Sequence, residues 1–182
     1  MINRLLFNFS SRLPCRLITV NDNPYLERYY MGKLFGFTFY LHRFVSSDSE
    51  KHIHNHPWKH GGSIILSGGY IEERLVDLCP SVSASGCATR KIKRLFFNVV
   101  NGNTFHRITY ARPKTWTLFF HNSRSVLRDE KYHSTYKGWG FLSREYVVGH
   151  HEVTMFKPYD TSNTMNWWET APTGKNSKRL PL

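Results

Sequence analysis

Four histidines lie close together in the first third of the sequence, at positions 52, 54, 56 and 60. Successive side chains of an extended strand point to opposite faces, so His52, His54 and His56 would share one face. Neutral imidazole is a ligand for zinc, iron, nickel and copper, and a metal offsets the cost of gathering polar rings in a protein interior. The competing interpretation is a histidine-rich strand end whose rings are solvated or hydrogen-bonded.

His106 is the candidate that completes a metal site with this stretch. It follows the turn signal at 101–103 in a second strand-like segment, and an antiparallel barrel can bring strands about fifty residues apart side by side. Three imidazoles on one face of a metal leave open positions opposite, as catalytic metal sites do. Because no carboxylate stands at ligand spacing, the ion would keep its full charge, which favours an anionic or thiolate substrate.

Short strands separated by turn signals predict an all-β sandwich or barrel. The clearest signal is the aromatic alternation over 34–45, after a hairpin turn expected at Gly32-Lys33. The basic N-terminal segment is expected to begin with an ordinary strand or helix, and we interpret 5–9 and 16–20 as short strands or packing arms.

A chain of 182 residues is expected to form one domain. We divide it into an N-terminal arm packed on the barrel (1–24), a barrel (25–156) and a basic, Pro- and Asn-rich tail (157–182), which would dock through Trp167 and Trp168. No apolar run reaches about eighteen residues, so no membrane span is expected. Three cysteines without paired spacing indicate free thiols and a cytoplasmic location.

Lysine and arginine outnumber aspartate and glutamate by 25 to 13, a net charge of +12. Such an excess attracts polyanions, so nucleic acid, nucleotides and phosphorylated substrates are candidate partners. The densest basic patch contains Arg90, Lys91, Lys93 and Arg94, which are the candidate nucleic-acid-binding residues. A solvated strand edge explains the same patch equally well.

The histidine segments resemble a known family. His54-Asn-His56, the downstream Gly68 and Asn101-Gly-Asn-Thr-Phe-His106 resemble the two short motifs of the cupin superfamily, small β-barrels also called double-stranded β-helices. His54-Asn-His-Pro-Trp58 and Leu66-Ser-Gly-Gly-Tyr70 are similar to a subgroup of uncharacterised small cupins from phages and bacteria. The resemblance covers about 25–156 and implies a jelly-roll barrel that binds one divalent metal.

By this resemblance the metal ligands are His54, His56 and His106, usually with one glutamate. That glutamate would fall at 60 or 61, where this chain has His60 and Gly61, so His60 is a candidate fourth ligand and His52 is expected outside the site. Three-histidine iron resembles the thiol and diketone dioxygenases among cupins, so Fe(II) is favoured over zinc, nickel or manganese. The lack of a His-x-Asp/Glu pattern argues against a 2-oxoglutarate oxygenase.

We therefore expect a mononuclear, dioxygenase-like metalloenzyme that acts on a small anionic metabolite, with isomerisation and hydrolysis as other reaction classes. Tyr70, Arg43 and Trp58 are the candidate substrate-binding residues, although a core position is the competing interpretation for Trp58. The alternative function is a non-catalytic basic cupin that binds a nucleotide, a sugar or nucleic acid, for instance as a phage protein acting against host defence in the host cytoplasm. Homodimerisation is a further expectation from the resemblance.

Overall fold

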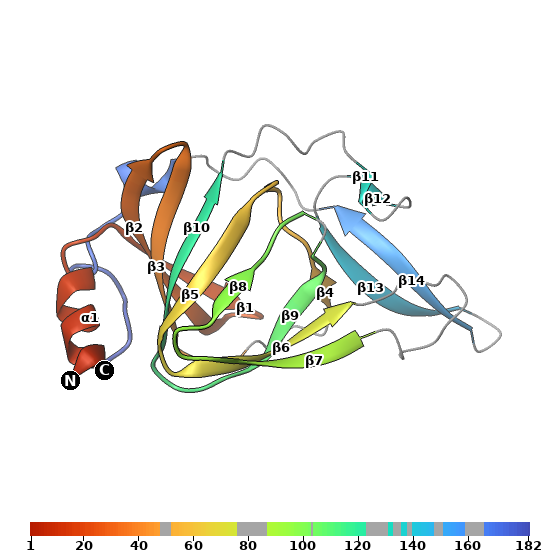
Figure 1. Ribbon diagram of the computed structural model, residues 1–182, viewed down its shortest axis with the longest axis horizontal. Coiled ribbons are helices and arrows are strands. Elements are labelled where there is room, and N and C mark those ends of the chain that lie inside the picture. Colours follow the sequence, from red (N-terminus) through yellow and green to blue (C-terminus); the bar gives the residue numbers. More distant parts are fainter. Residues whose placement is uncertain are drawn as a thin grey trace.

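Two antiparallel six-stranded sheets enclose the protein interior in the computed structural model (Figure 1). The structure describes residues 1–47, 52–75, 87–102, 104–122, 131–132, 136–137, 140–147, 151–158 and 166–182. Strands dominate these residues, so the predicted all-β, jelly-roll class is confirmed. Among them, no helix has the length and apolar character to span a membrane.

The first sheet has the order β1-β2-β3-β10-β5-β8, and the second has the order β14-β13-β4-β9-β6-β7. The first contains β1 (Cys15–Val20), β2 (Asn23–Leu34), β3 (Phe37–Phe44), β10 (Thr115–Asn122), β5 (Gly61–Ser67) and β8 (Phe97–Val99). The second contains β14 (His151–Pro158), β13 (Gly140–Val147), β4 (Ile53–His54), β9 (His106–Ala111), β6 (Gly69–Leu75) and β7 (Cys87–Lys93). A separate hairpin pairs β11 (Lys131–Tyr132) with β12 (Tyr136–Lys137), and a short 3-10 helix, η2, spans Trp167–Glu169.

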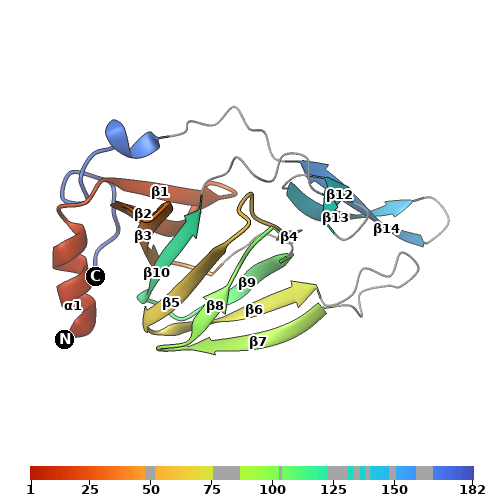
Figure 2. The same cartoon turned by 45° about the horizontal axis from the view of Figure 1, so that its top comes forward.

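Alternating side chains from both sheets form the apolar interior. One cluster joins Phe44 and Ile65 of the first sheet to Tyr70, Ile92 and Ile108 of the second. In Figure 2, strands β9, β6 and β7 run beneath β10, β5 and β8, which is the arrangement that this cluster holds together. Burial of these apolar side chains stabilises the packing of one sheet on the other. The positions of the inward-facing groups depend on this packing.

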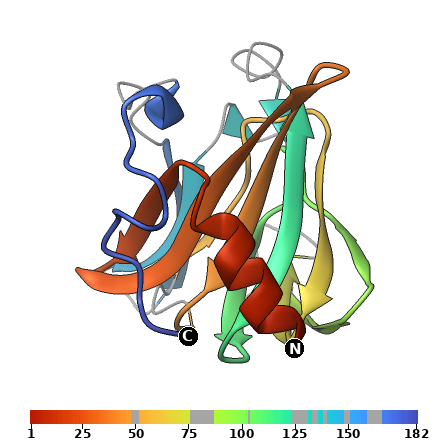
Figure 3. The same cartoon turned by 90° about the vertical axis from the view of Figure 1, so that its left-hand side faces the viewer.

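The N-terminal segment is a helix, one of the two forms expected for it; over 5–9 the packing-arm interpretation holds and the strand interpretation does not. Helix α1 spans Ile2–Ser10 and packs Leu6 and Phe7 against Leu41 and Trp116 on the outer face of the first sheet. Four apolar residues within the five positions 5–9 are too few to separate a strand from one side of a helix. Figure 3 shows α1 lying across one end of the strands, with the C-terminal tail beside it.

A buried ion pair holds the C-terminal tail on the same outer face. Glu27 and Arg43 are register partners on β2 and β3, with 3.2 Å between Arg43 Nη1 and Glu27 Oε2 and side chains 0% and 4% exposed, respectively. Arg43 donates to the carbonyls of Leu180 and Pro181, and the Leu180 N–H donates to Glu27 Oε1 at 2.7 Å. The end of the tail is therefore fixed by main-chain contacts to two buried charges, whereas Trp168, earlier in the tail, stacks on Tyr30 of the inner face with ring centroids 4.3 Å apart.

Replacing Arg43 with methionine should lower the free energy of unfolding by about 3–5 kcal/mol, because Glu27 would remain as a buried charge without its partner. The matched control is Arg107→Met. Arg107 pairs with Glu73 where the two side chains are 26% and 22% exposed, so its loss should cost about 0–1 kcal/mol. Urea unfolding measures both variants, and equal losses would contradict a special role for the buried pair.

Candidate metal centre

Three histidine side chains converge inside the barrel. Strands β4 and β9 pair where His54 lies opposite His106, and His56 follows immediately after β4. The ring centroids are 5.2 Å (54 to 56), 5.1 Å (54 to 106) and 5.0 Å (56 to 106) apart. Their ligand nitrogens all lie within 4.8 Å of one another. The structure thus brings together the three residues singled out from the sequence, and as a group they could hold a metal ion.

Asn55 fixes the segment that carries two of these rings. Its side chain is fully buried. The amide Nδ2 donates to the carbonyl of Gly102 at 2.9 Å, and the amide oxygen accepts from the Gly140 N–H at 2.8 Å. Because Gly102 precedes β9 and Gly140 begins β13, Asn55 ties the histidine segment to both of its neighbours. His54 and His56 are held on either side of this anchor.

The spacing of the rings fits coordination. His56 Nε2 and His106 Nε2 are 2.8 Å apart. Imidazole nitrogens lie about 2.0–2.1 Å from a bound metal such as zinc, so two at right angles are about 2.9 Å apart. A direct hydrogen bond between these two rings is the alternative explanation for the distance. Such a hydrogen bond would not explain why His54 also lies next to the other two rings, whereas a bound ion would be coordinated by all three.

The environment favours neutral rings, the form that binds a metal. Although both rings keep partial access to solvent, burial, followed by the charge of His106, lowers the pKa of His54 to about 3. Burial and then the charges of His106 and His54 lower the pKa of His56 well below its usual value. Near neutral pH both rings therefore present a lone pair.

Glu72 orients the third histidine from behind. Its carboxylate is 0% exposed and accepts from His106 Nδ1 at 2.6 Å, from Arg74 Nε at 2.8 Å and from Asn98 Nδ2 at 3.1 Å. Burial alone would raise the pKa of Glu72, but the hydrogen bonds and charges of His106 and Arg74 outweigh it and hold that pKa at about 2. With Nδ1–H directed at the carboxylate, Nε2 of His106 is left for the cluster, as in carboxylate–histidine–metal arrangements.

Trp58 lies against the cluster. It is 5% exposed and stacks on His56 with centroids 4.7 Å apart and on His121 at 4.2 Å. It also belongs to the buried apolar cluster with Tyr40 and Phe119, which agrees with the core interpretation. Its position at the edge of the candidate centre keeps it as a candidate substrate contact, a role that remains a prediction.

Sequence reasoning missed three polar residues around the centre, namely Arg28, His42 and His121, and left open whether Glu72 faces the barrel interior or solvent. Arg28 Nε donates to His42 Nε2 at 3.0 Å, and the Arg28 charge is among the causes that lower the pKa of His56. Alternation was the signal that could have found two of them. Residues two apart in a strand lie on the same face, so an inward-facing Tyr30 on β2 places Arg28 inward, and an inward-facing Tyr40 on β3 places His42 inward.

The other predicted site residues lie elsewhere. His60 is exposed and outside the three-histidine cluster, so the structure does not bring it in as a fourth ligand. His52 packs on Phe141, with centroids 5.4 Å apart. Tyr70 is buried in the core, where its hydroxyl accepts from Asn98 Nδ2 at 2.8 Å; it lies behind the cluster and supports the Glu72 network.

Arg43, predicted to bind substrate, lies on the opposite face of β3 from the histidine cluster. The alternation of β3 turns His42 inward and Arg43 outward, where Arg43 contacts Glu27 and the tail as described above. The predicted basic patch is also divided by alternation. Lys91, Lys93 and Arg94 are exposed, whereas Arg90 turns inward, with Nη1 3.8 Å from Glu72 Oε2.

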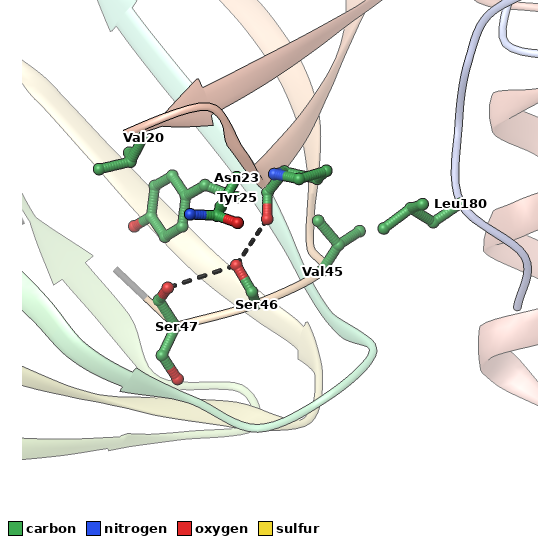
Figure 4. Close-up of a pocket in the computed structure, with 8 residues that line it drawn as sticks. Val20, Asn23, Tyr25, Val45, Ser46, Ser47 and Leu180 are labelled. Carbon is green, nitrogen blue, oxygen red and sulfur yellow. Dashed lines mark hydrogen bonds between the residues drawn. The ribbon is translucent and has the colours of Figure 1, made fainter. Parts of the chain in front are cut away.

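A pocket lies away from the histidines, at the turn between β1 and β2 (Figure 4). Its lining includes Val20, Asn23, Tyr25, Val45, Ser46 and Leu180, and shares no residue with the cluster. The Ser46 hydroxyl donates to the Pro24 carbonyl at 2.6 Å. Because neither a histidine nor a charged side chain lines this pocket, we assign it no chemistry.

No protein-family model matches the chain, and no curated protein matches it significantly. Among solved structures, a cupin-2 domain protein from Rhodospirillum rubrum is similar at 12% identity and a TM-score of 0.44, over 61% of this chain and 70% of that one. An Fe(II)-HppE structure with an alternative substrate is similar at 9% identity and a TM-score of 0.46, over 63% of this chain and 57% of that one. A recombinant oxalate oxidase in complex with glycolate is similar at 15% identity and a TM-score of 0.44, over 65% and 61%. Cupin proteins, the family that the motifs resemble, are thus among the structural neighbours.

Replacing Glu72 with glutamine should weaken metal binding about 10–100-fold, because the amide holds His106 less firmly and removes the negative charge behind it. The matched control is Glu73→Gln. Glu73 is the next residue, but it faces outward to Arg107, so metal affinity should be unchanged. Competition with a fluorescent chelator measures both variants. Equal affinities for the two variants would contradict the orienting role of Glu72.

His42→Gln should make stability less sensitive to acid. Burial, followed by the charges of Arg28 and His121, lowers the pKa of His42 well below its usual value. Below about pH 6.5 the unfolded chain therefore takes up a proton that the folded chain refuses, and stability falls as the pH falls. Removing this group should flatten the decline by up to about 1.4 kcal/mol per pH unit. Unfolding of the metal-free protein between about pH 7 and pH 5 measures this, and superimposable slopes would refute it.

Proposed function

We propose that the protein is a mononuclear metal-dependent enzyme whose ion is held by His54, His56 and His106. The observation that carries this proposal is the convergence of three imidazoles whose ligand nitrogens lie within 4.8 Å of one another. The carboxylate of Glu72 behind His106 adds support, since metal-binding histidines commonly donate their second ring N–H to such a group. All-imidazole coordination suits iron, zinc, nickel and copper. The preference for Fe(II) follows from the motif resemblance.

The charges around the cluster favour a small anionic substrate. Three neutral ligands leave the charge of the ion uncompensated. Glu72 is already engaged by His106 and Arg74. Arg28, half-buried on the inner face of β2, adds positive potential close enough to affect His56. A carboxylate or a thiolate would therefore be attracted to the centre.

A bound ion would supply Lewis acidity and, for iron, reactivity toward oxygen. The histidines would hold it from one side, which leaves the opposite positions for substrate. Glu72 would keep the Nδ1–H form of His106 throughout the reaction. Trp58, stacked on His56, would restrict that ring and keep water from one side of the centre. A dioxygenase-like reaction is our first assignment, with isomerisation and hydrolysis as the other classes.

A non-catalytic basic protein that binds a nucleotide, a sugar or nucleic acid is the second candidate. The observation that favours it is the exposure of Lys91, Lys93 and Arg94. These residues lie on the β7 edge strand and the turn that follows it, and none of them contacts the histidine cluster in the described part of the chain.

Purified protein should contain close to one equivalent of a divalent transition metal, because one cluster of three imidazoles defines one site. The double variant His54→Ala/His56→Ala should lose it, whereas His52→Ala/His60→Ala, which removes two histidines outside the cluster, should retain it. Elemental analysis by mass spectrometry measures the metal in all three proteins. Full retention in the first double variant would contradict the assignment.

The reaction class is tested separately from the metal. Oxygen uptake by the iron-loaded protein in the presence of small carboxylates and thiols should exceed that of the zinc-loaded protein. Binding of these anions by the iron-loaded protein without oxygen uptake would move the assignment to isomerisation or hydrolysis.

A further inference from the structure

Among the described residues, α1 and the C-terminal tail cover only part of the outer face of the first sheet. The part with Leu41 and Trp116 lies under α1 and the tail, and Figure 3 shows the strands extending beyond the helix. The other part carries four phenylalanines, Phe37, Phe39, Phe120 and Phe97, which we call the phenylalanine ladder. No described helix or tail segment packs on them: Phe97 is 51% exposed and the other three are half-buried, and a contiguous exposed apolar patch is a candidate interaction site.

The ladder is ordered by strand pairing. Phe39 and Phe120 are register partners on β3 and β10, with centroids 5.9 Å apart. Phe97 on β8 stacks on Phe120 at 5.9 Å, with the planes 20° apart, and Phe37 meets Phe120 edge to face at 6.0 Å. The rings therefore form one continuous row across four strands.

Gly62 makes the row continuous. It lies on β5 between β10 and β8, paired with Phe120 and Val99. A Cβ at this position would come within 3.1 Å of Phe97 Cζ and 3.2 Å of Phe120 Cζ. The missing side chain lets the two rings close over the strand backbone, and Phe97 remains 51% exposed at the edge of the sheet.

Positive charge lies at the same edge. Lys93 and Arg94 are exposed in the turn that leads from β7 into β8. The β9–β10 turn, which carries the exposed Arg112 and Lys114, lies at the other end of β10 from Phe120, because Thr115 pairs with Phe44 and Phe120 pairs with Phe39; these two cations are therefore not part of this surface. Flat apolar rings beside clustered cations are what the bases and phosphates of a flexible polynucleotide require.

We propose that the phenylalanine ladder and the basic turn beside Phe97, with Lys93 and Arg94, bind single-stranded nucleic acid. Bases stack on Phe97 and Phe120, and phosphates contact Lys93 and Arg94. A second copy of the chain fits less well, because pairing these edges would bring like charges together. Three of the described acids, Glu27, Glu72 and Glu73, are engaged by arginines and do not offset that repulsion.

The test is fluorescence anisotropy with a short labelled oligothymidylate. Wild-type protein should bind it, with an affinity that falls linearly in a plot of log K against log salt. Phe97→Leu and Phe120→Leu keep apolar bulk but lose the aromatic face, and each should weaken binding about fivefold or more. Lys93→Glu/Arg94→Glu should reduce the salt slope by about 1.4, the value for two phosphate contacts to a single strand.

The matched control is Phe9→Leu. Phe9 is 51% exposed, as Phe97 is, but it lies on α1, so binding should be unchanged. Photo-cross-linking of a bromouridine oligonucleotide to wild-type protein should map to Phe97 or Phe120, and this readout needs no variant to fold. A chelator should not alter binding, which separates this surface from the metal centre.

Absence of binding at low salt would overturn the proposal. Equal affinities for Phe97→Leu and Phe9→Leu would also overturn it, as would a Phe97→Leu variant that loses self-association and keeps oligonucleotide binding.

Discussion

The pairing of His54 with His106 is the constraint on which the candidate centre depends. Strand β4 is two residues long, and its only bridge to β9 joins these two histidines. Such a short strand has little pairing energy of its own, so Asn55 supplies the rest by bonding to Gly102 and Gly140. The Asn55 amide and the pairing of β4 with β13, in which His54 lies opposite Phe141, together hold two of the three candidate ligands, and β9 positions the third.

Charge is distributed around this centre in layers. The cluster itself carries no carboxylate, while Glu72 lies one layer behind it and is held between His106 and Arg74. In that position the carboxylate can orient a ligand without neutralising an ion. A buried carboxylate needs several donors to remain charged, and His106, Arg74 and Asn98 supply them. The same network extends through Asn98 to Tyr70, so the core and the site are stabilised together.

The sequence was sufficient to predict the all-β class, because alternation and turn residues are local patterns. Alternation and spacing also indicated a histidine cluster, but the choice of His54, His56 and His106 within it came from the motif resemblance. The sequence was not sufficient where the outcome depended on register. Alternation requires His42 and Arg43 to face opposite sides, but only the docking of α1 and the tail shows that Arg43 faces outward.

Two further differences have the same origin. The β2–β3 turn falls at Phe35-Gly36, both at positive φ, and not at Gly32-Lys33 as predicted. Gly32 instead accommodates a bulge where the β2–β3 register shifts after Tyr30. Glu72 was left unassigned because its partner, His106, is 34 residues away, and nothing local indicates which face of β6 meets β9.

X-ray absorption spectroscopy of the metal-loaded protein tests the central claim most directly, since it counts the ligands of the ion by type and distance. We expect three imidazole nitrogens at about 2.0–2.2 Å, with the remaining positions filled by solvent oxygen. Sulfur ligands, or a spectrum with fewer than three imidazoles that is unchanged by His106→Ala, would contradict a centre built on His54, His56 and His106.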